Sequence, residues 1–240
     1  MTVLWVYAIL GSVPREPPGV GLGGEAVRVL SIGQVLVSAG TLPTLPAEDA
    51  AALARHEAVI RGLARTVDAI LPLRFGAATA DEAALSALLA SRSAELLDAL
   101  ALVAGREQMT LRVYGDPQPP ADATPQAPPS PPGGGSTLRH GGRYMTARLV
   151  ARANAHAVPE IEPMRGSLAT FVRAERVEHH VLPPLLASVF HLVERGQAAP
   201  YAAAVEAAAA GLGSVRVAAT GPQPPYAFAP EALGLHASGQ

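Results

Sequence analysis

Histidine, glutamate and arginine occur together at one place in this sequence where they could carry out chemistry. His56 and Glu57 are adjacent in a segment with helical periodicity, and Arg74 follows shortly after it. An imidazole beside a carboxylate can act as an acid/base pair, with the arginine binding an anion. Alternatively, Glu57 and Arg74 form a buried ion pair while His56 packs or caps, and Arg92 competes for Glu57. We favour this structural interpretation because buried charges are normally retained with partners.

Arg74 lies in the short stretch Leu71–Gly76, "LPLRFG", around which the first half of the chain is organised. A short apolar run bounded by proline and glycine is typical of a buried strand that ends in a tight turn. An arginine within such a strand is costly unless it is paired. We therefore expect Arg74 to point outward or to have a carboxylate partner.

Other reactive groups are missing or wrongly spaced. All 18 basic residues are arginine and there is no cysteine, which excludes Schiff-base, P-loop and thiolate chemistry. His179 and His180 are adjacent and share no face, and His191 has no spacing typical of a zinc site. The glycines from Gly19 to Gly24 do not open a helix as a dinucleotide motif would. We predict no catalytic residue, no cofactor site and no metal site.

The composition suits one large domain or two small ones in 240 residues, 49% of them apolar. A formal net charge of −2 gives no basic face for nucleic acid. No apolar run is long enough to span a membrane. The apolar start, Met1 to Leu10, has no basic leader, so we expect a strand there and not a signal peptide.

Two segments with helical periodicity flank LPLRFG. The first runs from Ala47 to Asp68, with an apolar stripe formed by Leu53, Ile60, Leu63 and Val67. The second begins at the capping-box spacing Thr79 to Glu82 and ends near Val103, before Gly105. Strands are predicted at Thr2–Leu10 in a central position, at Val27–Ile32 and Gln34–Val37 around Gly33, and at Glu107–Tyr114.

A proline-rich segment divides the chain, since eight of the 21 residues from Asp116 to Ser136 are proline. We predict an N-terminal α+β domain at 1–115, an extended linker at 116–141 and a C-terminal domain with a tail at 142–240. The C-terminal part has helical patterns at Tyr144–Ala155, Met164–Arg176 and Tyr201–Ala210, and strand patterns at Leu185–Glu194 and Ser214–Ala219. The fold class is α+β, with two small domains, each a mainly antiparallel sheet with helices on one face.

The stretch Thr220–Phe228, "TGPQPPYAF", is a rigid tail because its prolines set an extended path. Its apolar anchors give two readings, a docking surface for a partner or a tie-down of the second domain. We select Pro222, Pro225, Tyr226 and Phe228 as candidate partner-binding residues, and both readings stay open.

Several motifs together resemble the gas vesicle protein F / gas vesicle protein L family. They are "LWVYAIL" at the N-terminus, "RHEAVI" from Arg55, "TVDAILPLRFG" from Thr66, "LRVYG" from Leu111, "GRYMTARL" from Gly142, "FHLVER" from Phe190 and the "TGPQPPYAF" tail. The match spans almost the whole chain. Two departures stand out: the family often has tryptophan in place of Gln223, and the region from Asn154 to Arg176 looks short.

The resemblance implies a non-enzymatic accessory protein of gas vesicle formation that associates with the apolar shell protein and with other accessory proteins. It also implies a ferredoxin-like second domain and a location at gas vesicles in the cytoplasm. A flexible proline-rich hinge would then let the two domains engage different partners. The alternatives are a small-ligand-binding regulatory module with a site near Arg74, and a hydrolase that uses His56 and Glu57. F-type and L-type roles, the surface that binds the shell protein and the oligomeric state remain open.

Overall fold

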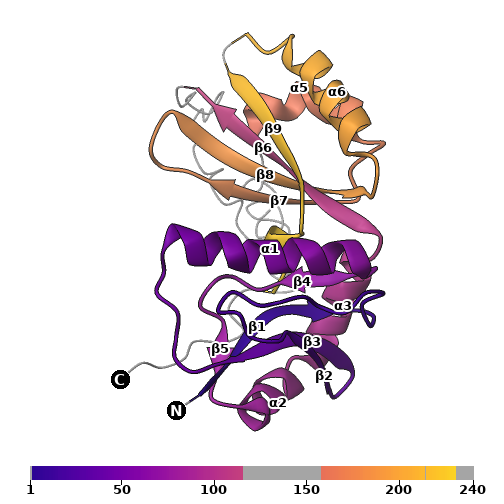
Figure 1. Cartoon of the computed structure of the whole chain (residues 1–240). Coiled ribbons are helices and arrows are strands. Elements are labelled where there is room, and N and C mark those ends of the chain that lie inside the picture. The colour runs from indigo at the N-terminus through magenta and orange to yellow at the C-terminus, as the bar shows by residue number, and fades with distance from the viewer. Residues whose placement is uncertain (1, 116–157, 214, 231–240) are drawn as a thin grey trace, which may run out of the picture.

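The described residues form two units, each built on an antiparallel sheet (Figure 1). The computed structural model describes residues 2–115, 158–213 and 215–230. One sheet has five strands and belongs to the N-terminal part of the chain, and the other has four. The protein is therefore α+β with two sheets, as the sequence predicts.

The first sheet is centred on β1 (Val3–Leu10), which confirms the expected central strand. Its order is β2 (Arg28–Ile32), β3 (Val35–Leu42), β1 and β4 (Ile70–Pro72), and the short β5 (Ala78–Thr79) also pairs with β1. Side chains of β1 alternate between two apolar clusters, with a register shift at Tyr7. A strand buried on both faces needs the continuous apolar sequence that β1 has.

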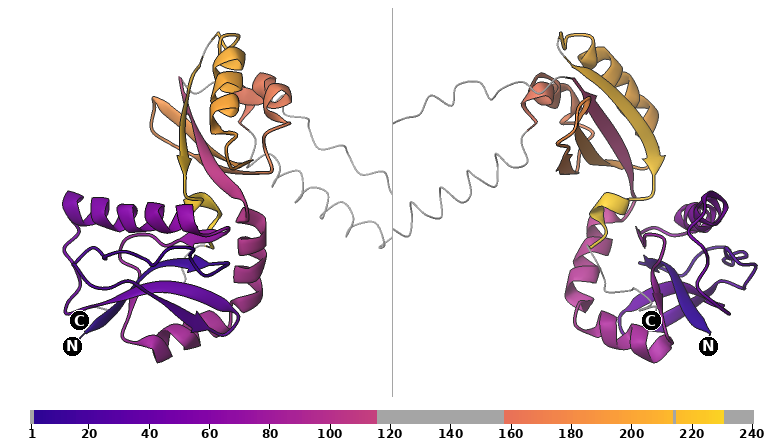
Figure 2. Two further views of the ribbon diagram at one scale, coloured as in Figure 1. Left: turned by 45° about the vertical axis from the view of Figure 1, so that its right-hand side comes forward. Right: turned by 90° about the vertical axis from the view of Figure 1, so that its left-hand side faces the viewer.

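Helices cover both faces of this first sheet, whereas the sequence predicts helices on one face. Helix α1 (Ala50–Thr66) packs on the face that carries Trp5 and Tyr7. Helices α2 (Glu82–Ala90) and α3 (Ser93–Val103) pack on the face that carries Leu4 and Val6. Figure 2 shows these two layers from the side.

The helix boundaries depart from the predicted ones where a polar residue caps an end. Asp81, and not Thr79, is the N-cap of α2, because its carboxylate accepts the Ala84 N–H at 2.8 Å. The single helix predicted up to Val103 is broken before Ser93, where Arg92 is the N-cap of α3. Leu53 is 41% exposed, because the buried stripe of α1 runs through Ala52, His56, Ile60 and Leu63.

The second sheet has the ferredoxin-like βαββαβ arrangement. Its elements are β6 (Arg106–Tyr114), the 3₁₀ turn η1 (Pro159–Ile161) with α5 (Glu162–Leu168), β7 (Ala174–His179), β8 (Leu185–Glu194), α6 (Ala198–Ala209) and β9 (Arg216–Gln223). The spatial order is β7-β8-β6-β9, with every pair antiparallel. Helices α5 and α6 pack on one face of it (Figure 2). The resemblance implies this fold, and the strand order confirms it.

Strand β6 corrects the predicted organisation of the chain. The sequence assigns residues 106–114 to the N-terminal domain, yet β6 is an inner strand of the second sheet, between β8 and β9. The segment 116–141 lies outside the described residues. Because it follows β6 and precedes η1, it connects two elements of the second unit and does not join the two units. We propose that the units divide at Gly105.

The second half also differs from its predicted elements, chiefly in the helix expected at Met164–Arg176. Helix α5 covers only the first part of the predicted helix Met164–Arg176, and β7 already begins at Ala174. The helix predicted at Tyr144–Ala155 lies outside the described residues. The predicted strand Leu185–Glu194 coincides with β8.

A short, tied connection joins the two units. Only Ala104 and Gly105 separate α3 from β6, and Gly105 has φ +67°, a left-handed conformation that favours glycine. The Gly105 N–H donates to the Asp68 carbonyl, and the Arg195 N–H donates to the Gly105 carbonyl, both at 3.0 Å. The Arg195 guanidinium also donates to the carbonyls of Val67 and Asp68, at 2.8 and 3.1 Å. We call this set of bonds the tied junction.

No helix among the described residues is long and apolar enough to cross a membrane.

Candidate functional site

His56 is enclosed by aromatic rings beneath α1 and is only 3% exposed. Its Nδ1 accepts the Trp5 Nε1–H at 3.1 Å, and its Nε2–H donates to the Leu73 carbonyl at 3.0 Å. The tautomer follows because an indole N–H only donates and a carbonyl only accepts. Burial lowers the pKa of His56 below its ordinary value. With both nitrogens occupied and the ring neutral, His56 is a structural residue and not a free acid or base.

Glu57 does not pair with Arg74, so the predicted Glu57–Arg74 ion pair is wrong. One carboxylate oxygen of Glu57 accepts from Arg61 Nε at 2.9 Å, and the other accepts the hydroxyl of Tyr226 from the second unit. Arg74 is exposed and has no ion pair within the described residues. Arg92, the expected competitor, pairs with Glu95 at 2.9 Å.

The reason is the direction in which α1 presents its side chains. Adjacent helical residues point about 100° apart, so when His56 faces LPLRFG, Glu57 faces away from it and toward the second unit. Phe75 of LPLRFG turns inward instead and packs against Trp5, with ring centroids 4.9 Å apart. The carboxylate of Glu57 is therefore used to hold the two units together.

Replacing Glu57 with alanine is expected to lower the free energy of unfolding by about 1–3 kcal/mol, because it leaves the half-buried Tyr226 hydroxyl unpaired. Arg74→Ala is the matched control and should change it by less than about 0.5 kcal/mol, since Arg74 is exposed. Urea denaturation measures both. In a Tyr226→Phe background the Glu57→Ala loss should shrink, and equal losses in the two backgrounds would contradict the contact.

The tail holds the two units together, and most of it is not a free surface. Of the four candidate partner-binding residues, Pro222 is exposed, Tyr226 is half-buried, and Pro225 and Phe228 are buried. Phe228 belongs to the same apolar cluster as β1 and α3 of the first unit. Phe228 therefore anchors the tail to the protein core, as one of the two interpretations expected, but it packs against the first unit as well as the second.

Gln108, on the inner strand β6, fixes the tail in this position. Its side-chain carbonyl accepts the Ala227 N–H at 2.9 Å, and Arg176 donates to the Ala227 carbonyl at 2.7 Å. Gln223, where the family often has tryptophan, donates to Thr110 Oγ1 at 3.0 Å. These bonds place the tail between the sheet of the second unit and the core of the first.

A hydrogen-bonded network of side chains that the sequence did not predict lies in the second unit. His191 contacts the Tyr201 hydroxyl at 2.7 Å and Glu175 at 2.8 Å, and Arg165 holds Glu175 through two bonds of 3.0 Å. A hollow of about 320 Å³ opens beside Arg165, Glu175 and His191. His191 has no partner near it in sequence, and the 10 residues to Tyr201 carry no known motif, so no sequence signal points to this group.

The order hydroxyl, imidazole, carboxylate is that of a catalytic triad, but Tyr201 lacks the properties of a nucleophile. Its side chain is fully buried, and burial raises its pKa above the ordinary value, whereas an activated nucleophile needs a lowered pKa. Within residues 2–115, 158–213 and 215–230, no three acidic or histidine side chains come together as metal ligands would. We assign this network around His191 a structural role beneath α6.

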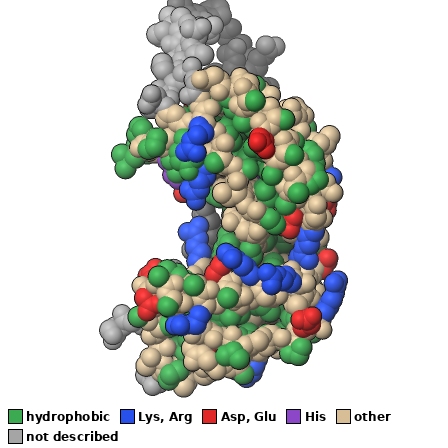
Figure 3. All heavy atoms as spheres, turned by 45° about the horizontal axis from the view of Figure 1, so that its top comes forward, with side chains coloured by type: hydrophobic (Ala, Val, Ile, Leu, Met, Phe, Trp, Pro, Cys, Tyr) green, Lys and Arg blue, Asp and Glu red, His purple; other side chains and the backbone are tan. Residues whose placement is uncertain are grey.

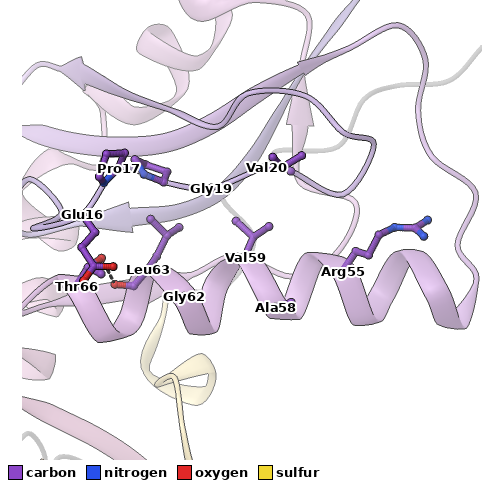
Figure 4. Close-up of a pocket in the computed structure, with 12 residues that line it drawn as sticks. Glu16, Pro17, Gly19, Val20, Arg55, Ala58, Val59, Gly62, Leu63 and Thr66 are labelled. Carbon is purple, nitrogen blue, oxygen red and sulfur yellow. Dashed lines mark hydrogen bonds between the residues drawn. The ribbon is translucent and has the colours of Figure 1, made fainter.

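A groove of about 420 Å³ lies between α1 and the loop 16–21 (Figure 4). Val20, Val59 and Leu63 point toward it, while Glu16 stands at one end and Arg55 at the other. Its full lining is Glu16, Pro17, Pro18, Gly19, Val20, Gly21, Arg55, Ala58, Val59, Gly62, Leu63 and Thr66. We call it the α1 groove.

The α1 groove is open and partly apolar at its surface. Val20 is 68% exposed, and a Cβ added at Gly62 would meet no atom within 4 Å. Glycine within a helix is unfavourable relative to alanine by up to about 1 kcal/mol, and here it keeps one wall of the groove low. An apolar floor with opposite charges at its two ends suits a protein segment better than a small polar molecule.

The tip of the turn between β7 and β8 carries the two most exposed large apolar side chains among the described residues. Val181 and Leu182 are 95% and 80% exposed there. This tip lies on the second unit and contributes no residue to the α1 groove.

Among the described residues, the acid/base groups considered above are buried and hydrogen-bonded, and similarity to known proteins indicates the family. A family model described as "Gas vesicle synthesis protein GvpL/GvpF" matches residues 3–230. The chain belongs to the GvpL/GvpF family.

Individual GvpL and GvpF proteins agree with that assignment. The chain is 27% identical to gas vesicle protein L of Streptomyces sp. (strain CB03234), over 94% of this chain and 92% of that protein. It is similar in fold to the crystal structure of GvpF from Anabaena sp. PCC7120, with a TM-score of 0.68, 17% identity, and coverage of 96% of this chain and 97% of that one. GvpF from Microcystis aeruginosa gives a TM-score of 0.68 and 18% identity, covering 95% and 99%.

The two stretches most specific to the GvpL/GvpF resemblance meet in the structure. Leu71 and Leu73 of LPLRFG and Phe228 of the tail lie in one apolar cluster. The family signature thus corresponds to the contact between the units. Membership in GvpL/GvpF associates this chain with gas vesicles and their synthesis.

Proposed function

We propose that this chain is an accessory protein of gas vesicle assembly that binds the apolar shell protein and other accessory proteins in the cytoplasm and catalyses no reaction. The observation that carries the proposal is the family match over residues 3–230. Gas vesicle protein L of Streptomyces sp. (strain CB03234) matches this chain over 92% of that protein's length.

The chemistry of the described residues supports a binding role. The two histidines best placed for acid/base work, His56 and His191, are buried and hydrogen-bonded at both ring nitrogens. Arg74, around which a ligand site was the alternative, is exposed and lines neither the α1 groove nor the hollow beside His191. These features favour a binding role over the small-ligand and hydrolase alternatives.

The α1 groove is the surface that we assign to the shell protein. A strongly apolar subunit must be shielded from self-association until it is added to a growing wall, and an open apolar groove provides such a contact. The alanine-rich helix α6 is a less suitable surface, because it buries Tyr201 and Val205 in the core of the second unit. The tail is engaged between the units.

The test is capture of the shell protein by the purified full chain carrying Val20→Asp. A charge in the middle of an apolar contact should weaken capture at least about tenfold. Val13→Asp is the matched control, since Val13 is also 68% exposed in the same loop region but does not line the groove. Binding by the wild type with equal loss in both variants would exclude the groove, and no binding by the wild type would overturn the proposed function.

A second variant distinguishes the α1 groove from the exposed tip of the β7–β8 turn. Leu182→Asp changes the β7–β8 tip and leaves the α1 groove intact. Our assignment requires full capture by this variant. If Leu182→Asp alone abolished capture, the assembly role would stand and the groove would not be its surface.

A further inference from the structure

Four arginines line a cleft of about 370 Å³ between the two units. Arg61 and Arg65 come from α1 of the first unit, and Arg106 and Arg195 come from the second. We call this hollow the arginine cleft. Figure 3 shows positive side chains gathered along the indented waist between the units. The chain as a whole carries a net charge of −2, so this concentration of positive charge is local.

The positive charge of the cleft is only partly neutralised by the protein. Within the described residues, Arg65 has no hydrogen-bond or ion-pair partner, and Arg195 donates only to main-chain carbonyls. Glu107 is the one carboxylate in the lining, and it accepts the Gly196 N–H at 3.2 Å.

The other two arginines share carboxylates that have further partners. Arg61 pairs with Glu57, which also accepts from Tyr226. Arg106 contacts Glu194 at 3.5 Å, and Glu194 binds Arg173 more closely, at 3.0 Å. A ligand with several negative charges would therefore meet guanidinium groups that are not saturated, and guanidinium binds oxyanions through short, charge-assisted bonds.

The lining also indicates the shape of the ligand. Arg61 and Arg65 are one helical turn apart, which separates their Cβ atoms by about 5–6 Å. Alternate side chains on one face of an extended peptide are about 7 Å apart. Apart from Gln223, the remaining wall is apolar, formed by Ile70, Ala64 and the prolines of the tail. Spaced cations along an apolar wall fit a peptide with alternating acidic residues better than a single small anion.

We propose that the arginine cleft binds an extended, carboxylate-rich segment of a partner protein. That the partner is another gas vesicle component rests on the proposed function, but the binding chemistry does not. The cleft and the α1 groove lie on different faces of α1, because at about 100° per residue Arg61 and Arg65 point away from Val59, and the two hollows share no lining residue. A second partner could therefore bind while the groove is occupied.

The test is fluorescence anisotropy of the purified full chain with a short labelled peptide of alternating glutamate and alanine. We expect binding that weakens as salt is added, and no binding of the same peptide with glutamine in place of glutamate. Arg65→Glu should weaken binding about tenfold at low salt, and Arg65→Gln by a smaller factor in the same direction. Arg65 is exposed, so both variants should keep the wild-type melting temperature.

The matched control is Arg55→Glu, because Arg55 is an exposed arginine on the same helix that lines the α1 groove and not the cleft. Its peptide affinity should equal that of the wild type. The proposal is overturned if the wild type does not bind the glutamate peptide, if Arg55→Glu and Arg65→Glu weaken binding equally, or if inorganic phosphate at the same charge concentration displaces the peptide. No shell protein is present in this assay, so its failure is distinguishable from failure of the proposed function.

Discussion

Phe228→Ala is expected to lower the free energy of unfolding by about 3–5 kcal/mol, which is the range for truncating a buried phenylalanine. The ring is 1% exposed and lies in one apolar cluster with Leu71 and Leu96 of the first unit and Leu192 of the second. The guanidinium of Arg176 also stands 5.6 Å from the ring centroid, within the range of a cation–π contact. Truncation therefore opens a cavity where the two units meet.

Chemical denaturation of the full chain measures this loss, with Val181→Ala as the control. Val181 is 95% exposed, so its truncation should change stability by less than about 0.5 kcal/mol. Hydrogen exchange should show faster opening of β8 and α3, which contact the cavity from the two units. A loss below about 1 kcal/mol would mean that the tail does not join the cores.

A deletion of the tail would disturb the contact between the units as well as remove a possible docking surface. Removing residues from Tyr226 onward takes away both the Glu57 contact and the Phe228 anchor. Loss of partner binding in such a deletion would follow from separation of the units as readily as from loss of a docking surface. Point substitutions in the α1 groove and the arginine cleft avoid this ambiguity.

His56→Phe is expected to lower the free energy of unfolding by about 2–5 kcal/mol although it keeps an aromatic ring in place. The substitution leaves two buried groups unpaired, the Trp5 indole N–H and the Leu73 carbonyl, and each unpaired group costs about 1–3 kcal/mol. In a Trp5→Phe background one of these groups is gone, so the same substitution should be less damaging. Equal losses in both backgrounds would show that the Trp5 contact contributes nothing.

The same residue predicts a pH dependence of stability. The pKa of His56 is lowered in the folded protein, mainly by burial, so the unfolded chain binds a proton more readily. Its contribution to stability is complete above the unfolded value of about 6.5. It is lost as the pH falls from there toward the lower folded pKa, by at most about 1.4 kcal/mol per pH unit. Denaturation curves from about pH 8 to about pH 5 should show a smaller decline for His56→Phe than for the wild type.

The sequence predicted strands correctly where a run of apolar residues is also buried in the structure. The runs at Leu185–Glu194 and Thr2–Leu10 are strands in the structure, and each carries the largely continuous apolar sequence that a strand buried on both faces needs. The sequence also indicated the family through several motifs, and two of them, LPLRFG and the tail, meet where the units contact each other. What it missed at the helix ends was a choice between neighbouring polar residues, Thr79 and Asp81, that could both cap.

Long-range partners were beyond the reach of local pattern. Glu57 is held by Tyr226, 169 residues away, and a nearby arginine is a poor guide to such a contact. The strand at 106–114 was recognised as a strand, but alternation does not say which sheet a strand joins. The proline-rich segment is predicted to be a domain linker because linkers have that composition, while the two residues at which we propose to divide the units have no such signature.

The tied junction would fix the relative orientation of two partners bound at the α1 groove and the arginine cleft. Because bonds from Gly105 and Arg195 converge on the end of α1, the helix that separates the α1 groove from the arginine cleft is fastened to both units. Two proteins held on either side of α1 would meet at one angle, set by the fold and not by diffusion of a tether. The chain would then act as a geometric template, presenting each incoming subunit to the next in a constant pose.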